Sequence, residues 1–483
     1  MSRSGPRWRF TGTAILVALI VAPAWVAVAI AAVALTLRAG AFAAAVWRRR
    51  ASLRQAAGSD RFLLGVEERS GRAVALSDQH LAAHGLILGA SGSGKSTTLL
   101  RILSEEIARN RPVVAIDLKG SPSFAQSLER AAVRAGRPFR LWTLDGPEQW
   151  NPLAVGNPTE LKDKLIATER FSEPHYQRAA ERYAQLALRT MTELQPSRPV
   201  TLTRVVGLLD PDRLLALARG LEPDRREQLS DYLRSLTRDQ LSAIRGLSSR
   251  LAIITESHTG AFLGDAPGGI DLRRALGARS GDPGGEVVLF SLNSATYGQL
   301  AAQVGTLAVQ DLVTATGARL RDGYTGRAFV AIDEFSALRS DNVLALVTRA
   351  REAGVSVFVA TQELVDLDRA ARGLREQVIG NTGIKIAHRQ DVPESAEAVS
   401  RMAGTVRTWE RSYQEQPAGL VLGRGMGLRK QRGATARLVE RPVVDPERVR
   451  SLQTGAALVT IKTPQSSARV VHVTPPSRDG PER

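Results

Sequence analysis

Cysteine is absent from the 483-residue sequence, and aromatic residues make up only 5% of it. Without cysteine the protein has no disulfide bond and no thiolate metal site, which is compatible with a reducing cytosol. Lysine is also scarce, because only seven of the 65 basic residues are lysine and the others are arginine. With abundant alanine and glycine, this preference is typical of a high-GC bacterial genome and does not indicate a function.

Acidic residues are missing from positions 1–54, which carry eight arginines. Since the whole chain has a net charge of +17, the remaining residues keep +9. Within that remainder, residues 401–441 hold nine basic and three acidic residues. This balance favours an anionic partner without distinguishing nucleic acid from lipid headgroups. The length is sufficient for two or three domains with a sizeable core.

Charged residues of either sign are missing from residues 13–37, which are almost entirely apolar. A helix of this length would span about 37 Å, more than the hydrocarbon core of a bilayer at about 30 Å. Arg48, Arg49 and Arg50 follow the run as a cytosolic anchor. We therefore predict a membrane anchor in residues 1–54, either as one span or as a tight hairpin. A signal peptide and a buried core helix are the alternatives, and both are usually shorter.

The sequence LILGASGSGKST at residues 86–97 has the pattern of a buried strand, a glycine-rich turn and the start of a helix. Positions 89–96 fit the phosphate-loop pattern G-x-x-x-x-G-K-[ST] without departure. Glycines let successive N–H groups point inward at phosphate oxygens, and the helix N-terminus adds the positive end of its dipole. The strand before the loop and the helical pattern after it argue against a chance match.

The loop predicts ATP and Mg²⁺ as cofactors. The Lys95 ammonium can reach the β- and γ-phosphates, and the Ser96 hydroxyl can hold Mg²⁺. The residues predicted to bind the nucleotide are Gly89, Ala90, Ser91, Gly92, Ser93, Gly94, Lys95, Ser96 and Thr97.

Apolar runs alternate with helical stretches through most of the chain, which is typical of a parallel sheet covered on both faces. A short strand pair is predicted at residues 61–66 and 72–76, before the loop. After the loop, strands are predicted at residues 112–117, 139–145, 286–292, 327–333, 355–362 and 383–387, and long helices at residues 295–320, 342–353 and 393–402.

Residues 157–255 differ from this pattern, because strand-like runs disappear and apolar residues recur at three- and four-residue spacing. Basic and acidic residues are mixed there as on solvated helix faces. The segment therefore predicts a separate all-α domain inserted into the nucleotide-binding domain, and it contains no catalytic motif.

A second motif is the sequence AFVAIDEF at residues 328–335, in which an apolar strand ends in two acids. Asp333 is predicted to hold Mg²⁺ through water, and Glu334 to orient and activate the attacking water. Acidic pairs after apolar strands are common, so this assignment depends on the phosphate loop.

Polar residues around the following strand are further candidates. Gln362 ends that strand, and its amide can lie near the γ-phosphate and sense hydrolysis; a plain strand end is the alternative. Arg349 and Arg351 precede the strand. One of them can act as an arginine finger on the nucleotide of a neighbouring subunit, although arginines on helix surfaces are usually solvated.

The region from residue 404 onwards is predicted to be less regular. Residues 417–436 are rich in glycine and arginine and predict a basic hairpin or loop. A final antiparallel pair is predicted at residues 457–462 and 468–473, and a disordered tail at residues 476–483.

The order of these features resembles the conjugative type IV coupling proteins (TraG/TraD-like), membrane ATPases of the FtsK/HerA superfamily. The resemblance covers roughly residues 10–475. It rests on the anchor, the phosphate loop, the inserted helical domain, and the motifs at residues 113–120, 151–153, 329–335, 351–355, 360–362 and 381–386. The short membrane region and the Gly/Arg-rich segment depart from the family pattern.

The resemblance implies an inner-membrane homo-hexamer whose ATPase domain lies in the cytoplasm. It implies that the protein recruits a relaxase–DNA complex to a type IV secretion channel and drives transfer of single-stranded DNA. The implied partners are single-stranded DNA, relaxase or relaxosome proteins, channel components and membrane lipids. Arg351 matches the trans-acting arginine of the family by its distance from Gln362.

Two other functions stay open at the level of sequence. One is an FtsK/HerA-like translocase of double-stranded DNA, although nothing after residue 440 has the pattern of a DNA-reading helical domain. The other is a docking receptor that uses ATP only to switch state, without motor activity.

The predicted fold class is α/β, with a P-loop RecA-like nucleotide-binding domain, an inserted all-α domain and an N-terminal transmembrane anchor. The predicted boundaries are residues 1–54 for the anchor, 60–156 and 256–475 for the two parts of the nucleotide-binding domain, 157–255 for the insert and 476–483 for the tail.

Overall fold

The computed structural model describes residues 60–169, 171, 173–277, 285–324, 326–338, 340–415 and 432–476, together with Val33. The predicted anchor in residues 1–54, most of the Gly/Arg-rich segment and nearly all of the predicted tail lie outside these residues. Within the part that is described, no helix combines the length and the apolar character needed to cross a membrane.

An eleven-stranded sheet forms the centre of the described structure, in the order β2-β1-β13-β12-β9-β3-β8-β7-β4-β6-β5. From β9 to β5 all neighbouring strands are parallel, as predicted, and the four strands beyond β9 are antiparallel. The strands are β1 (Arg61–Glu67), β2 (Ala73–Ser77), β3 (Gly85–Leu88), β4 (Val113–Asp117), β5 (Phe139–Thr143), β6 (Val287–Ser291), β7 (Ala328–Asp333), β8 (Val355–Thr361), β9 (Ile384–Ala387), β12 (Ala456–Ile461) and β13 (Ser467–Val473).

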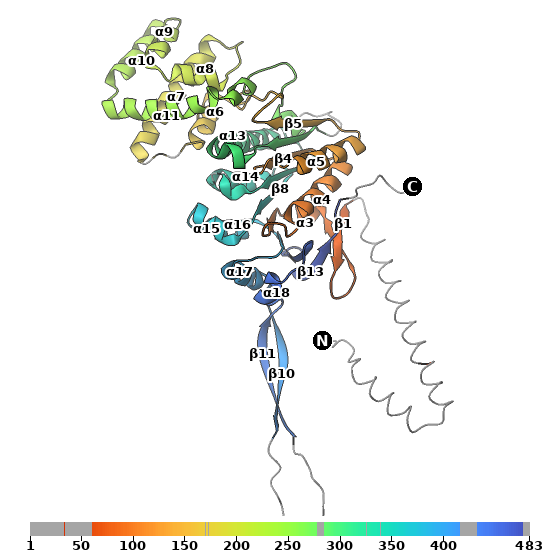
Figure 1. Cartoon of the computed structure of the whole chain (residues 1–483). Coiled ribbons are helices and arrows are strands. Elements are labelled where there is room, and N and C mark those ends of the chain that lie inside the picture. The colour runs from red at the N-terminus through yellow and green to blue at the C-terminus, as the bar shows by residue number, and fades with distance from the viewer. Residues whose placement is uncertain are drawn as a thin grey trace, which may run out of the picture.

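The central parallel strands are mostly apolar because both faces of the sheet are covered. In β4, Val114 and Ile116 belong to one buried cluster, and Val113 and Ala115 belong to the other. Helices α4 (Lys95–Ala108) and α5 (Pro122–Arg134) contribute to the second cluster, and α13 (Ser294–Arg321) and α14 (Ser340–Ala350) to the first. Figure 1 shows these two pairs of helices on opposite sides of β4 and β8.

The helical segment predicted at residues 157–255 consists of helices at one end of the molecule, beyond β5 (Figure 1). They are α6 (Pro158–Ala167), α7 (Pro174–Leu194), α8 (Leu202–Leu208), α9 (Pro211–Ala218), α10 (Pro223–Ser235) and α11 (Arg238–Thr255). A buried polar network ties α6 to α13: Lys164 Nζ lies 2.7 Å from Asp311 Oδ1, and Trp150 Nε1 donates to Asp311 Oδ2 at 3.0 Å. Treating this segment as a domain of its own stays a prediction.

The region after residue 404 is more regular than expected. The strands β10 (Thr405–Glu415) and β11 (Arg432–Pro442) form a separate antiparallel pair that projects away from the sheet (Figure 1). The prediction of a less regular region was wrong for these residues, because the strands of this hairpin are exposed and their sequence has no regular alternation of apolar and polar residues. The antiparallel pair β12–β13 confirms the predicted final pair.

Shorter elements complete the chain. They are α3 (Asp78–Leu81), the 3₁₀ turn η1 (His258–Phe262), α12 (Leu272–Ala275), the 3₁₀ turn η2 (Phe335–Ala337), α15 (Leu364–Ala370), α16 (Leu374–Asn381), α17 (Pro393–Ala403) and α18 (Pro446–Arg450).

Candidate nucleotide site

The phosphate loop connects the end of β3 to α4, and its glycines are required by close contacts. A Cβ atom on Gly89 would lie 2.4 Å from Ser93 Oγ, and one on Gly94 would lie 3.0 Å from the backbone nitrogen of Gly455. Gly94 also has φ +112°, a conformation that residues with a side chain rarely adopt. The Gly89 N–H donates at 3.1 Å to the carbonyl of Gln362, a residue outside the loop, and this hydrogen bond fixes the loop against the end of β8.

The loop ends at the N-terminus of α4, where Lys95 is the first helical residue. The first N–H groups of a helix have no acceptor within the helix, and the helix dipole adds partial positive charge at the same place. The arrangement suits phosphate oxygens, as the sequence predicted.

Two acids from β7 meet this loop from the side. Lys95 Nζ lies 3.1 Å from Asp333 Oδ1 and also pairs with Glu334 Oε1. Ser96 Oγ lies 3.5 Å from Asp333 Oδ2. Glu334 has φ +55°, and a strained backbone at a non-glycine residue is often found at functional sites. The structure therefore brings together four residues that the sequence placed in one site, although the chain separates the two pairs by more than 230 residues.

Gln362 joins the same cluster from the end of β8, because its Nε2 donates to Glu334 Oε1 at 3.3 Å. Lys119, which the sequence did not single out, lies with its Nζ 2.7 Å from that oxygen. Lys119 follows β4, and β4 pairs with β7 so that Asp117 is opposite Asp333. Knowing that these strands are neighbours would have revealed the lysine.

The pKa values of Glu334 and Asp117 are shifted in opposite directions. Burial disfavours the ionised form of Glu334, but Lys95 and Lys119 hold its pKa below the usual value. Burial raises the pKa of Asp117 to about 6, and the negative charge of Asp333 adds to this rise. Hydrogen bonds that Asp117 accepts from the backbone N–H groups of Ser121 and Lys119 oppose it. Glu334 is therefore kept ionised and able to accept a proton.

His388 supports the loop from behind and was also missed by the sequence analysis. Its Nδ1 donates to the Ala456 carbonyl at 2.9 Å, so its Nε2 accepts the hydrogen bond of Thr98 Oγ1 at 2.8 Å. Burial lowers the pKa of His388 to about 4, and the imidazole is neutral at physiological pH. The side chain has no signal in the sequence because its partners lie 290 and 68 residues away.

Magnesium fits this site through oxygen atoms. Ser96 and Asp333 present a hydroxyl and a carboxylate side by side, the donor types that Mg²⁺ prefers. Across the described ranges, no group of three or more His, Asp or Glu side chains is placed to hold a metal ion. An ion at Ser96 and Asp333 would therefore take its other ligands from phosphate and water.

Arg351 is not part of this cluster. It precedes β8, whose other end carries Gln362, and its charge acts on His84 at the start of β3. Since β3 and β8 are parallel, Arg351 lies at the edge of the sheet opposite the phosphate loop. Its predicted role requires a second subunit and stays a prediction, as do the roles of the other site residues.

Two family models match parts of the sequence. Residues 327–454 match the family described as the TraM recognition site of TraD and TraG, and residues 46–120 match the FtsK/SpoIIIE family. These matches confirm the predicted resemblance to the coupling proteins of the FtsK/HerA superfamily of P-loop ATPases. No curated protein matches the sequence.

Solved structures of coupling proteins and of a related ATPase have a similar fold. The bacterial conjugative coupling protein TrwB, as TrwBdeltaN70, is 15% identical with a TM-score of 0.62, covering 88% of this chain and 91% of that one. TrwB in complex with ADP and Mg²⁺ is 14% identical with a TM-score of 0.56, covering 89% and 93%. VirB4 of Thermoanaerobacter pseudethanolicus is 14% identical with a TM-score of 0.52, covering 86% and 96%. At these identities the likeness shows the RecA-like α/β fold alone.

Proposed function

We propose that this protein is a coupling ATPase, which hydrolyses ATP to drive DNA transfer by connecting a relaxase–DNA substrate to a type IV secretion channel. The observation that carries the proposal is the cluster at Glu334, where Lys95, Lys119 and Gln362 all contact one carboxylate oxygen beside the phosphate loop. The proposed form is a homo-hexamer in the inner membrane, anchored by residues 1–54, with the ATPase in the cytoplasm.

The chain's own residues can carry out each step of hydrolysis. The N–H groups at the start of α4 and the Lys95 ammonium bind the β- and γ-phosphates. Glu334 accepts a proton from the attacking water while the oxygen of that water bonds to the γ-phosphorus. At the same time the bond between the γ-phosphorus and the β–γ bridging oxygen breaks. Gln362 donates to Glu334 and keeps the carboxylate aimed. Mg²⁺, when bound through Ser96 and Asp333, neutralises phosphate charge.

Partners are proposed from charge and from the family match. The balance of +9 over residues 55–483 supports contact with the phosphates of single-stranded DNA. The match of residues 327–454 to a TraM recognition family supports contact with relaxosome proteins through that part of the chain. Channel components and membrane lipids complete the proposed set.

Substitutions in the full-length protein test the ATPase proposal. Lys95→Ala should abolish both nucleotide binding and hydrolysis. Glu334→Gln should keep binding and lower kcat by about 10²- to 10⁴-fold, the usual contribution of a general base. Turnover and equilibrium binding of ATP measure the two effects separately. Parental turnover in either variant would contradict the assignment of that residue.

DNA stimulation separates the motor from a docking receptor. A motor should hydrolyse ATP faster when single-stranded DNA is added, and this stimulation should weaken steeply as salt rises. A receptor that only switches state should bind a relaxase in an ATP-dependent way without that stimulation. Stronger stimulation by duplex than by single-stranded DNA would favour a double-stranded DNA translocase.

A further inference from the structure

The hairpin β10–β11 is a two-stranded sheet whose outer edges are both free of a further strand in the part of the chain that the structure describes. It has eleven residue pairs, from Thr405 opposite Pro442 to Glu415 opposite Arg432. An isolated two-stranded hairpin is marginally stable in water, and a free strand edge presents unpaired N–H and C=O groups to another strand. The hairpin is therefore an incomplete sheet.

The root of the hairpin is fixed to the rest of the subunit. The Val443 N–H donates to the Gly404 carbonyl at 2.9 Å. Ser400 Oγ on α17 donates to the Val444 carbonyl at 2.6 Å, and both of these residues are buried. Figure 1 shows the hairpin projecting from this root at the end of the molecule opposite helices α7 to α11. Copies that assemble side by side around one axis would therefore point their hairpins in the same direction.

Exposed apolar side chains gather on this hairpin. Seven large hydrophobic side chains are exposed among the described residues, and three of them are Val406, Trp409 and Leu438. Trp409 and Leu438 are directly opposite each other, so they lie on the same face of the hairpin. Tryptophan is enriched among the residues that dominate the binding energy of protein–protein contacts. The pair is therefore suited to contact another protein surface.

Charged side chains in the described part of the hairpin compensate one another. Arg407 donates to Glu440 at 3.1 Å, and Arg441 pairs with Glu410. Two of the three arginines whose side chains are described are therefore neutralised by glutamates. Such a surface attracts a polyanion only weakly, whereas a protein surface with the same alternation of charges is complementary to it.

A second hairpin of the same sequence has this complementary pattern. When two hairpins stand side by side and point the same way, β10 of one copy runs antiparallel to β11 of the next, as it does within one chain. In a similar register, Arg407 of the neighbouring copy lies beside Glu440, and Trp409 of the neighbouring copy lies beside Leu438. The side-chain pairs found within one chain would then recur between chains.

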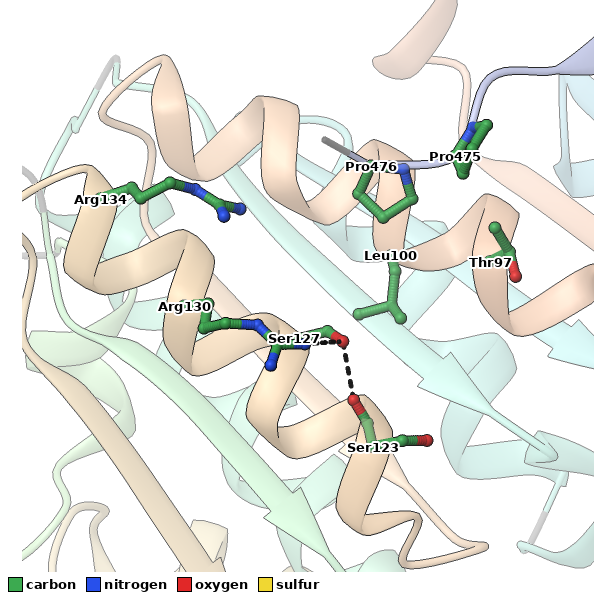
Figure 2. A pocket seen from close by; sticks show the side chains of 8 residues that line it. All are labelled: Thr97, Leu100, Ser123, Ser127, Arg130, Arg134, Pro475 and Pro476. Carbon is green, nitrogen blue, oxygen red and sulfur yellow. Dashed lines mark hydrogen bonds between the residues drawn. The ribbon is translucent and has the colours of Figure 1, made fainter. Parts of the chain in front are cut away.

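Two pockets of the described surface do not provide another binding place for the hairpin. One, of about 510 Å³, lies between α4 and α5 beside the phosphate loop (Figure 2), so it adjoins the candidate nucleotide site. The other, of about 260 Å³, lies between α7 and α10, at the end of the molecule opposite the hairpin (Figure 1). The hairpin of a copy with the same orientation does not reach that end.

We propose that the hairpins of neighbouring copies pair edge to edge, β10 of one with β11 of the next, and form an antiparallel collar at one end of the proposed ring. The inference rests on the proposed function, because the ring is part of that proposal. The partner is a second copy of this chain. In a closed ring every hairpin has two neighbours, so no strand edge remains free.

The lack of cysteine makes this pairing testable by disulfide formation, because an introduced cysteine is the only thiol of the chain. Val439→Cys is mixed, as full-length protein, with Val406→Cys, Thr408→Cys or Glu410→Cys, which scan the register in two-residue steps on one face of β10. On oxidation, at least one mixture should give about tenfold more covalent dimer than either variant alone, because neighbouring strands are within the reach of a disulfide.

Each variant alone is a control, since identical positions of neighbouring copies are two strand spacings apart. That separation is about 10 Å, beyond the Cα separation of about 7 Å that a disulfide allows. Val439→Cys mixed with Val133→Cys, an exposed position on α5, controls for random collision and should give no dimer above that background.

The apolar pair provides a second test. The double variant Trp409→Ser, Leu438→Ser should raise the concentration at which half of the subunits are assembled by about tenfold or more, as measured by sedimentation of the full-length protein. ATP binding should not change, because the hairpin lies outside the candidate nucleotide site. The double variant Val133→Ser, Ile253→Ser removes two exposed apolar side chains elsewhere and is the matched control, which should stay within about threefold of the parent.

The outcomes separate this inference from the proposed function. A parent protein that sediments as a monomer at every concentration would reject the ring, and the collar with it. Assembly of the parent without a disulfide in any of the three mixtures, or unchanged assembly of the Trp409→Ser, Leu438→Ser variant, would overturn the collar alone. Disulfides that form only after single-stranded DNA or anionic vesicles are added would also overturn it, because the polyanion would then be the partner of the hairpin.

Discussion

At the scale of single residues, Glu334 is held ionised by two lysines of different burial. The Lys95 side chain is only 4% exposed, whereas that of Lys119 is 39% exposed. Lys95 is also predicted to bind phosphate, so Lys119 is the lysine that can stay paired with Glu334 during the proposed hydrolysis. We therefore propose that Lys119 positions Glu334, the proposed general base, and keeps it ionised.

Replacing Lys119 should change the pH dependence of hydrolysis more than its affinity for ATP. Without the positive charge of Lys119 the pKa of Glu334 rises, so at low pH a larger fraction of the protein has Glu334 protonated and is inactive. In Lys119→Ala the acidic limb of kcat should move to higher pH, with about tenfold lower kcat on that limb for each unit of pKa change. Steady-state rates from pH 5 to pH 8 measure it.

Lys119→Arg is the control for this experiment, because it keeps the charge and should keep the profile. KM for ATP should stay within a few-fold in both variants. An unchanged acidic limb in Lys119→Ala would show that Lys95 alone sets the ionisation of Glu334.

Two buried histidines should make stability depend on pH. Burial lowers the pKa values of His84 and His388 to about 4 each, with Arg351 adding to the effect at His84 and Lys95 at His388. In the unfolded chain both histidines accept a proton near pH 6.5. Between about pH 6.5 and pH 4 the unfolded state therefore binds more protons than the folded state, and the free energy of unfolding falls as the pH falls. Each can contribute about 1.4 kcal/mol per pH unit. Asp117, whose pKa is raised to about 6, has the opposite effect, because below that pH its protonation stabilises the folded state.

The double variant His84→Gln, His388→Gln isolates this contribution. It should be less stable than the parent at pH 7.5, because Val357 and Thr98 lose or weaken their hydrogen bonds to the two rings. Its melting temperature should nevertheless fall less between pH 7 and pH 5. Equal slopes for parent and variant would show that other groups dominate the acid sensitivity.

The sequence predicted those site residues that belong to a short local motif. Lys95, Ser96, Asp333 and Glu334 follow apolar strands in recognisable patterns, and the structure places them in contact. Lys119 and His388 have no such motif, because each acts through a strand order that a single sequence does not encode. Arg351 shows the converse, since its predicted role depends on a second chain.

At the scale of elements, prediction worked where burial gives a continuous signal. Strands such as β4 and β8 are buried at every residue, so their apolar runs are visible in the sequence. The hairpin β10–β11 gives no such signal. Its cross-strand pairs include Arg407 with Glu440 and an exposed apolar pair, Trp409 with Leu438, at 68% and 47% exposed.

The hairpin should be removable without loss of the core. The Val443 N–H donates to the Gly404 carbonyl at 2.9 Å, so the two ends of the hairpin are adjacent. Replacing residues 405–442 by an Asn-Gly turn should leave the melting temperature within roughly 2 °C of the parent, because less than about 1 kcal/mol of stability is at stake. ATP binding should be unchanged. A large drop in either quantity would show that the hairpin supports the fold.

At the scale of the whole molecule, the predicted role of Arg351 requires a particular arrangement of subunits. It lies at the opposite edge of the sheet from the phosphate loop, so it can reach a nucleotide only on another copy of the chain. The proposed ring, if its interfaces are head-to-tail, would allow that contact, because each subunit would then present one edge to the next subunit's site.

Mixing two inactive variants tests this arrangement. Arg351→Ala should bind ATP normally and lose hydrolysis, and Lys95→Ala should lose both. In mixed rings, an Arg351→Ala subunit that faces a Lys95→Ala neighbour has an intact lysine in its own site and an intact arginine across the interface. With equal amounts and random assembly, about a quarter of the interfaces have this composition in a head-to-tail ring, so activity should recover to at most about a quarter of the parental value.

Mixing Lys95→Ala with the double variant Lys95→Ala, Arg351→Ala should restore nothing, since no subunit then has an intact phosphate site. Full activity of Arg351→Ala alone would reject the arginine finger. Absence of recovery, in mixtures shown by cross-linking to contain both variants, would reject its action across the interface.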